Sequence, residues 1–185
     1  MNDYIYLEEE SGGLFANLVL RVDELGIFEI TRCKIDTGCA KTNIPIRRLN
    51  ISNKRAEALK QKAINEKVPY NPTYGVSDTI DIRKKDKDLI KNGNLMDVKS
   101  LRFNYNADSI TLDDQWLGGC DIGINFDRTG NILIGLDILK RFQIIIDTSV
   151  ITGKYTLIGC LKSQPEKETY YNAIKKHFLL HDNCN

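Results

Sequence analysis

Short runs of apolar residues, separated by polar turn residues, recur along most of the chain and predict strands. The runs at residues 14–22 and 27–35 flank a turn at residues 23–26, so they predict a hairpin that leads into Asp36. Further apolar runs at residues 98–105, 110–112 and 122–126 are separated by Asn, Asp and Gly. This pattern is typical of a mostly β domain.

Two helical patterns and one charged run interrupt the strands. Ser52 is placed to cap a surface helix over residues 52–67, whose apolar stripe is weak. The mixed-charge run at residues 83–91 indicates a solvated loop or strand tip. Residues 132–134 form an apolar strand pattern that continues through Gly135 into a short helix over about residues 137–142 and another strand at 143–146.

The last part of the chain predicts a hairpin followed by an amphipathic helix. The hairpin turns at residues 152–153 and returns through residues 154–158. Ser163 and Glu166 have capping-box spacing, and the apolar positions that follow lie on one helical face. We therefore expect a main domain over residues 1–160 and, as part of the same domain, a C-terminal helical extension over residues 161–185.

The length and composition of the chain limit the functions and partners that are plausible for it. A chain of 185 residues fits one domain, so a cleft built from two equivalent halves needs two chains. The 26 Lys and Arg residues nearly balance the 25 Asp and Glu residues, which argues against nucleic acid or an anionic membrane as partner. Peptide or protein is the expected partner.

The lack of a recognisable secretion or membrane signal, together with the pattern of cysteines, favours a cytoplasmic location. The first ten residues are acidic where a secretion signal is basic and then apolar, and no apolar run is long enough to span a bilayer. The five cysteines are scattered and odd in number, which suits reduced thiols. We expect a soluble, cytoplasmic protein.

The segment most suggestive of chemistry is Asp36-Thr37-Gly38, which follows the apolar strand at residues 27–35 and precedes Ile44 and Pro45. A strand fixes a carboxylate rigidly, and glycine allows close approach of the backbone. The tripeptide alone also describes an ordinary turn. The flanking apolar residues, together with the later Ile-Leu-Ile-Gly segment at residues 132–135, favour a buried, functional loop.

These two segments resemble the motif pair of the retropepsin-like aspartic proteases: apolar-apolar-Asp-Thr-Gly, then apolar-apolar-Gly and a short helix. The resemblance covers about residues 14–45 and 130–147. It implies a mostly β, closed acid-protease fold in which residues 133–135 lie beside the Asp-Thr-Gly loop, with an inserted helix and a C-terminal helix. It also implies a homodimer. Asp36 then corresponds to the catalytic acid, and Thr37 to the residue whose hydroxyl braces the active-site loop across the dimer. Gly38 corresponds to the glycine of the turn. Gly135 corresponds to the glycine of the second motif, whose role is packing.

The resemblance further implies a mobile flap that closes over bound peptide. Tyr74, Gly75 and Val76 are the candidate substrate-binding residues, because they lie between the two motifs and Gly75 is flexible. A plain loop is the simpler interpretation of these residues. Gly118 and Gly119 compete for the same role.

Two neighbouring Asp36 carboxylates cannot both ionise easily, so the pair would share a proton and supply both a base and an acid. The base activates water and the acid protonates the peptide carbonyl oxygen, without metal or organic cofactor. The expected activity is that of an aspartic endopeptidase. The alternatives are a catalytically silent dimer that binds a protein, and an enzyme that cuts only itself or one dedicated partner.

Several features depart from the family pattern. The 99 positions from Asp36 to Gly135 exceed what a compact viral enzyme needs. Cys39 stands where Ala or Ser is usual, and it is interpreted either as a small packed residue or as an oxidisable switch. The tail covers apolar surface, extends the dimer interface or occludes the cleft. His177, His181 and Cys184 have metal-ligand spacing, but solvated side chains explain them more simply.

Overall fold

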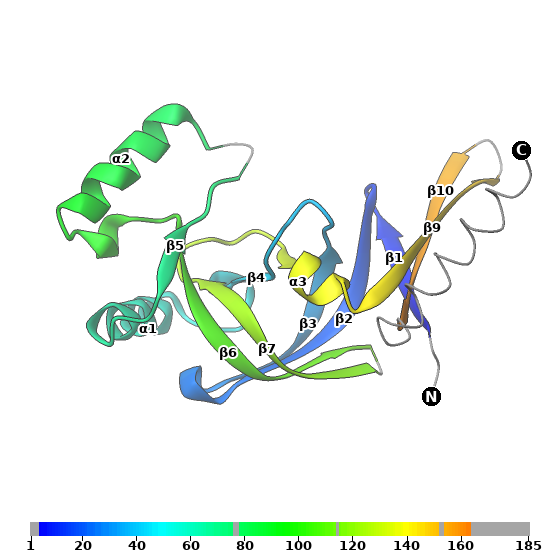
Figure 1. Ribbon diagram of the computed structural model, residues 1–185, viewed down its shortest axis with the longest axis horizontal. Coiled ribbons are helices and arrows are strands. Elements are labelled where there is room, and N and C mark those ends of the chain that lie inside the picture. Colours follow the sequence, from blue (N-terminus) through cyan, green and yellow to red (C-terminus); the bar gives the residue numbers. More distant parts are fainter. Residues whose placement is uncertain (1–3, 76–77, 114, 152–153, 164–185) are drawn as a thin grey trace, which may run out of the picture.

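The structure is a computed structural model that describes residues 4–75, 78–113, 115–151 and 154–163. The protein is mostly β, as predicted (Figure 1). The strands are β1 (Tyr4–Glu10), β2 (Gly13–Val22), β3 (Ile27–Ile35), β4 (Asn43–Pro45), β5 (Tyr70–Pro72), β6 (Leu101–Leu112), β7 (Gln115–Asn125), β8 (Ile132–Ile134), β9 (Phe142–Ile151) and β10 (Lys154–Ser163). The helices are α1 (Asn53–Asn65), α2 (Ile80–Lys91) and α3 (Leu136–Leu139), with short 3-10 turns η1 (Asp23–Leu25), η2 (Ile46–Arg48) and η3 (Leu95–Asp97).

Six strands form a closed ring of pairings, in the order β2, β3, β8, β4, β7 and β6, and β6 pairs back onto β2. Alternate side chains of these strands fill the interior of the ring, where apolar area is removed from water. Fully buried members of this core include Leu18, Leu20, Phe103, Ile124 and Ile132. The ring therefore supplies a rigid scaffold for the loops at its edge.

Strand β8 lies between two strands that are consecutive in the chain. β3 and β4 are joined by the loop that carries Asp36, yet β8 pairs in parallel with β3 and in antiparallel orientation with β4. The register sets Lys34 opposite Leu133 and Ile35 opposite Ile134. The second motif is thus placed against the first by backbone pairing.

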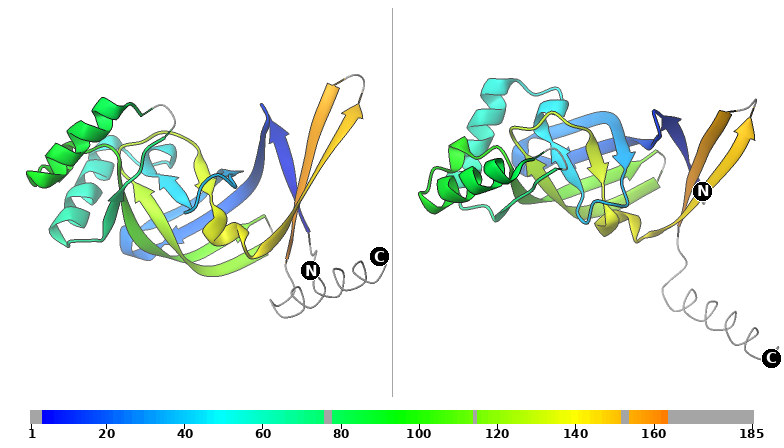
Figure 2. Two further views of the ribbon diagram at one scale, coloured as in Figure 1. Left: turned by 45° about the horizontal axis from the view of Figure 1, so that its top comes forward. Right: turned by 90° about the horizontal axis from the view of Figure 1, so that it is seen from above.

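The remaining elements extend the ring at opposite ends (Figures 1 and 2). At one end β1 pairs with both β2 and β10, and β10 pairs with β9. At the other end lie β5, α1 and α2 (Figure 2). The salt bridge between the buried Lys60 of α1 and Asp127 (2.7 Å) helps to anchor α1, because the same ammonium also donates to the carbonyls of Met96 and Val98.

Several predicted elements are confirmed. The hairpin at residues 14–35 is β2 and β3 with η1 at the turn, and the strand before Gly135 is β8, followed by the short helix α3. Helix α1 begins after Ser52, whose side chain accepts a hydrogen bond from the backbone N–H of Arg55. The predicted C-terminal helix lies outside the described residues.

The structure corrects two predictions and adds one strand that was not predicted. The charged run at residues 83–91 belongs to α2, which Thr79 caps by accepting a hydrogen bond from the N–H of Ile82. The separate runs at residues 98–105 and 110–112 belong largely to one strand, β6, which has register shifts between Ala107 and Thr111. Strand β1 was not predicted, because three consecutive glutamates end it.

Candidate active site

The loop that carries Asp36 continues directly from β3. The Asp36 N–H donates to the carbonyl of Ile134 at 3.0 Å, which extends the pairing between β3 and β8 by one residue. The Gly38 N–H donates to Asp36 Oδ1 at 2.9 Å, so the loop's own backbone orients the carboxylate. Asp36 is half-buried, whereas Thr37 and Gly38 are exposed, so the prediction of a buried loop is wrong: the apolar flanks are buried but the turn between them faces solvent. The three residues predicted to be catalytic are therefore together on one short loop.

Gly135 is packed against the backbone of this loop. A Cβ atom at Gly135 would lie 2.7 Å from the carbonyl oxygen of Cys39, 2.7 Å from the carbonyl carbon of Lys41 and 2.9 Å from the nitrogen of Thr42. Backbone atoms cannot rotate away as a side chain can, so only glycine fits here. The adjacent Leu136 N–H donates to the carbonyl of Cys39 at 2.8 Å. The second motif thereby supports the first.

A buried hydrogen-bond network joins the same loop to α3. The carboxylate of Asp137 accepts from the Thr42 N–H at 2.8 Å and from the Thr42 hydroxyl at 2.8 Å. It also accepts from the N–H of Ile138, while the Thr42 hydroxyl oxygen accepts from the Gly135 N–H. Thr42 is fully buried. These bonds satisfy the Asp137 carboxylate structurally and fix the end of the Asp36 loop.

Sequence reasoning missed both Thr42 and Asp137. Neither residue belongs to the tripeptide or to the apolar run that drew attention to the two segments. The only local signal was an acid in the first turn of the short helix, where a carboxylate is favourable in any case. Their partnership depends on β8 lying beside the loop, which the linear pattern does not encode.

Asp36 shares its face of the ring with a row of outward residues. Residues alternate between faces along a strand, so Lys34 and Asp36 project to the same side of β3. Lys34 is paired with Leu133, Leu133 with Asn43, and Asn43 with Gly123 of β7. Directly paired residues point to the same face of a sheet. This row, which we call the outer row, crosses β3, β8, β4 and β7 beside Asp36.

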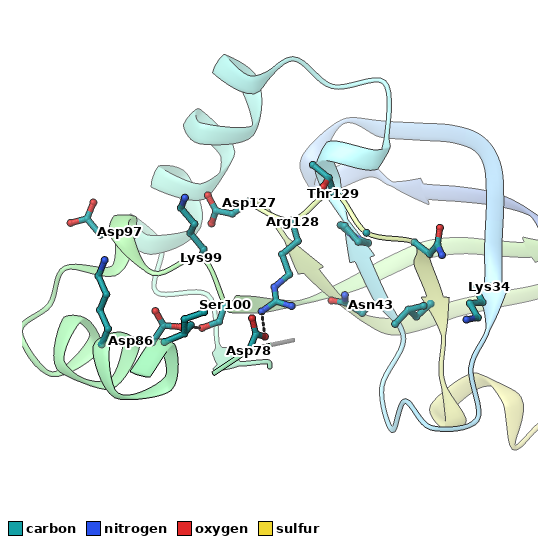
Figure 3. A pocket seen from close by; sticks show the side chains of 16 residues that line it. Lys34, Asn43, Asp78, Asp86, Asp97, Lys99, Ser100, Asp127, Arg128 and Thr129 are labelled. Atoms are coloured by element: carbon teal, nitrogen blue, oxygen red, sulfur yellow. Dashed lines mark hydrogen bonds and ion pairs between the residues drawn. The ribbon is translucent and has the colours of Figure 1, made fainter. Parts of the chain in front are cut away.

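A cavity of about 670 Å³ opens over part of the outer row. The strands of the ring contribute Lys34, Asn43 and Leu133 to its lining, and α2 contributes Ile82 and Asp86. In Figure 3, Lys34 and Asn43 lie on one side of the cavity and Asp86 lies on the other. The size falls within the range of cavities that hold extended ligands. Asp36 is not itself among the lining residues, but it lies two positions from Lys34 on the same face.

The segment predicted as the flap leads into the wall of this cavity. Tyr74 and Gly75 follow β5, and Val76 lies outside the described residues. The Asp78 carboxylate accepts from the Gly75 N–H at 2.5 Å and from Arg128 Nη2 at 2.6 Å (Figure 3). These hydrogen bonds hold the pKa of Asp78 below its usual value, the Arg128 bond being the larger cause. The described part of the segment is thus tied to the loop after β7.

The competing glycines lie elsewhere. Gly118 and Gly119 belong to β7, and Gly118 has a left-handed φ of 71° in a region where the pairing with β6 is shifted. Neither residue lines the cavity beside the outer row.

Cys39 packs within the Asp36 loop. Its thiol donates to the carbonyl of Lys41 at 2.9 Å. Burial is the main reason that the pKa of this thiol is raised, and the positive charge of Arg102 opposes that shift. A raised pKa favours the thiol over the more reactive thiolate. This environment is that of a packed residue.

The described residues were predicted to need no metal and to include no membrane-spanning segment. In the described ranges, no group of three or more His, Cys, Asp or Glu side chains is placed to hold a metal ion, and His177, His181 and Cys184 lie outside those ranges. None of the helices in that part of the chain has the length and apolar character needed to cross a bilayer.

Comparison of the chain with models of protein families, with curated proteins and with solved structures gave no match.

Proposed function

We propose that the protein is a homodimeric, retropepsin-like aspartic endopeptidase that hydrolyses peptide bonds with water activated by two Asp36 carboxylates, one from each copy. The observation that carries the proposal is the support of the Asp36 loop by Gly135 and by the bonds of Thr42 to Asp137. This bracing keeps a half-buried carboxylate in a fixed position beside a cavity. Such pre-organisation is what acid–base chemistry requires.

The proposed mechanism needs a second carboxylate close to the first. Asp137 is unsuitable, because N–H and O–H donors from Thr42 and the N–H of Ile138 already occupy its oxygens. A second copy of the chain supplies another Asp36 instead. Two adjacent carboxylates share one proton, so that one acts as base towards water and the other as acid towards the peptide carbonyl. The pair titrates as a unit.

Thr37 supports the dimer in this proposal. Its side chain is exposed, and its hydroxyl makes no hydrogen bond to any part of the chain that the structure describes. A twofold axis beside Asp36 would bring this hydroxyl against the loop of the partner copy. Each chain would then brace the other's catalytic loop.

The free thiols of the described residues support a location in a reducing compartment. Cys33, Cys39 and Cys120 are free thiols within the described residues, as expected in a reducing compartment. We place the enzyme in the cytoplasm, where it acts on peptide or protein segments that reach the cavity in extended form.

The test compares three proteins: wild type, Asp36→Asn and Asp36→Ala. Each is incubated with a diverse peptide library at pH values from mildly acidic to neutral, and products are identified by mass spectrometry. The proposal predicts cleavage by the wild type and a loss of about 10²–10⁴-fold or more in both variants. Light scattering and circular dichroism check that the variants remain folded dimers.

The possible failures are informative. Equal cleavage by all three proteins would show that Asp36 is not the catalytic acid. A wild-type dimer that binds peptides but cuts none of them would favour a catalytically silent binding module.

A further inference from the structure

The side-chain stem of Arg102, in β6, lies against Gly123, the member of the outer row in β7. A Cβ atom at Gly123 would come within 2.0 Å of Arg102 Cδ, 2.5 Å of Cγ and 2.6 Å of Nε. The absence of a side chain at Gly123 is therefore what makes room for the arginine stem. Gly123 is paired with Asn43, so this stem lies on the same face of the ring as Lys34 and Asp36.

The guanidinium of Arg102 is not satisfied by the chain. Its Nε atom is buried and has no hydrogen-bond partner, and no ion pair joins the guanidinium to a carboxylate in the part of the chain that the structure describes. A buried donor without an acceptor is costly, more so when the group is charged. The arrangement is suited to an acceptor that arrives with a ligand.

A second cavity, of about 370 Å³, lies beside this arginine. Lys41 of the Asp36 loop and Asn71 of β5 line it together with Arg102. Two carboxylates also line it, but Asp121 accepts a hydrogen bond from the side-chain amide of Asn106, and Asp137 is bonded to Thr42. Neither carboxylate is ion-paired with Arg102 within the described residues, so the donors of this guanidinium remain open to a ligand.

We propose that Arg102 binds the carboxylate of an acidic side chain, Asp or Glu, in the substrate peptide. This inference rests on the proposed function, since it concerns peptide bound beside Asp36. An arginine fork holds a carboxylate through two parallel hydrogen bonds, which supplies both the missing acceptor and a fixed geometry. Lys41 adds a second positive charge at the same place.

Lys41 links this cavity to the Asp36 loop, because Lys41 lies five positions after Asp36 in the chain and lines the cavity together with Arg102. We therefore expect the acidic side chain at one of the outer positions of the bound peptide and not beside the scissile bond. In a twofold dimer the partner copy places its own Arg102 at the equivalent position on the other side.

The test uses peptides of about ten residues with an apolar centre, a single Glu moved through the outer positions, and a matched set with Gln in place of Glu. The wild type is compared with Arg102→Gln, Arg102→Lys and, as a control, Arg48→Gln. Arg48 is an exposed arginine of η2 that does not line this cavity. The measured quantity is the ratio of kcat/KM for the Glu peptide to that for its Gln twin.

The wild type and Arg48→Gln should prefer Glu by about 10- to 100-fold at one outer position, the range expected for a charge-assisted hydrogen bond. The ratio should fall to about one in Arg102→Gln, and Arg102→Lys should recover only part of it because a lysine lacks the fork. Thermal melting confirms that the variants are folded. A wild-type ratio near one at every position, or a ratio that survives in Arg102→Gln, would overturn the inference while leaving the peptidase proposal intact.

A binding measurement separates the two proposals when cleavage fails. Fluorescein-labelled Glu and Gln peptides are titrated with the Asp36→Asn variant and with the double variant Asp36→Asn, Arg102→Gln. Binding is followed by fluorescence anisotropy. Tighter binding of the Glu peptide that depends on Arg102 would support the inference even if no protein cuts any peptide. Equal binding of the two peptides would refute it.

Discussion

Gly135→Ala tests whether the second motif supports the loop that carries Asp36. The added methyl group would meet three backbone atoms of residues 39–42 at 2.7–2.9 Å. These atoms cannot move without shifting the loop, and the shift weakens two hydrogen bonds: Leu136 N–H to Cys39 carbonyl, and Gly135 N–H to Thr42 hydroxyl. The substitution therefore acts on the loop that positions Asp36.

The expected cost combines two terms. Overpacking a filled site costs roughly 1–3 kcal/mol, and each weakened hydrogen bond adds about 0.5–1.5 kcal/mol at most. We expect a loss of about 3 kcal/mol in the free energy of unfolding. For a chain of this size that loss lowers Tm by roughly 6–12 °C. Peptide cleavage should fall further, since a displacement of about 1 Å in a catalytic group can cost about 10²-fold.

Gly130→Ala is the matched control for stability, because a Cβ atom there has no neighbour within 4 Å. Gly130 lines the cavity over the outer row, so activity is compared with the wild type instead. Urea unfolding at constant pH gives the free energies, and a peptide substrate gives kcat/KM. The control should remain within about 0.5 kcal/mol of the wild type. If Gly135→Ala were as stable as the control and as active as the wild type, the packing between the two motifs would not be what holds the loop.

Three further predictions concern other groups of the protein. Asp137→Asn should lower stability by about 1–3 kcal/mol in urea unfolding and reduce cleavage, since Thr42 loses a charged acceptor; unchanged values would refute this. The pKa of Asp78 is lowered in the folded protein, so its ion pair with Arg128 stabilises above the unfolded value of about 4 and is lost as pH falls through the folded pKa. Arg128→Gln should therefore flatten the decline of stability below pH about 4, and an unaltered acid profile would count against the pair. Burial raises the pKa of Cys33 to about 12, so iodoacetamide at mildly alkaline pH should leave this thiol unmodified until the protein unfolds, as peptide mapping would show.

The elements that sequence predicted are those that carry a local pattern. The β2–β3 hairpin has apolar runs on both sides of a turn, and α1 has Ser52 as a cap, so short-range patterns suffice. Strand β8 and helix α3 were also predicted from a local pattern, the apolar run that ends at Gly135, although distant pairing with β3 and β4 holds β8 in place.

The elements that sequence missed are those whose stability comes from distant contacts. Helix α2 buries little of its surface: Ile80 remains 70% exposed, and its buried residue Asp86 is bonded to Ser100. Its apolar stripe is therefore too weak to distinguish a helix from a charged loop. Strand β1 is held by pairing with β2 and β10, and its first four residues, Tyr-Ile-Tyr-Leu, carry a short strand pattern that was overlooked beside the three glutamates.

The residues of the candidate site also fall into those that the sequence identified and those that it missed. Asp36, Thr37 and Gly38 were found from their tripeptide and its flanks, whereas Arg102 and Gly123 gave no signal. These two residues meet because β6 and β7 pair in one particular register, with Asn104 opposite Gly123. A register shift of one residue would turn the arginine to the other face, so no composition rule identifies it.

The central claim, that two copies each supply one Asp36, is tested most directly by mixing wild-type and Asp36→Asn chains. The two proteins are unfolded together in equal amounts, refolded so that they pair at random, and assayed for peptide cleavage at constant total protein. If both carboxylates are needed, only wild-type pairs cut, and about one quarter of the pure wild-type activity remains. A residual activity of about one half would show that each chain works with its own Asp36 and would contradict the account.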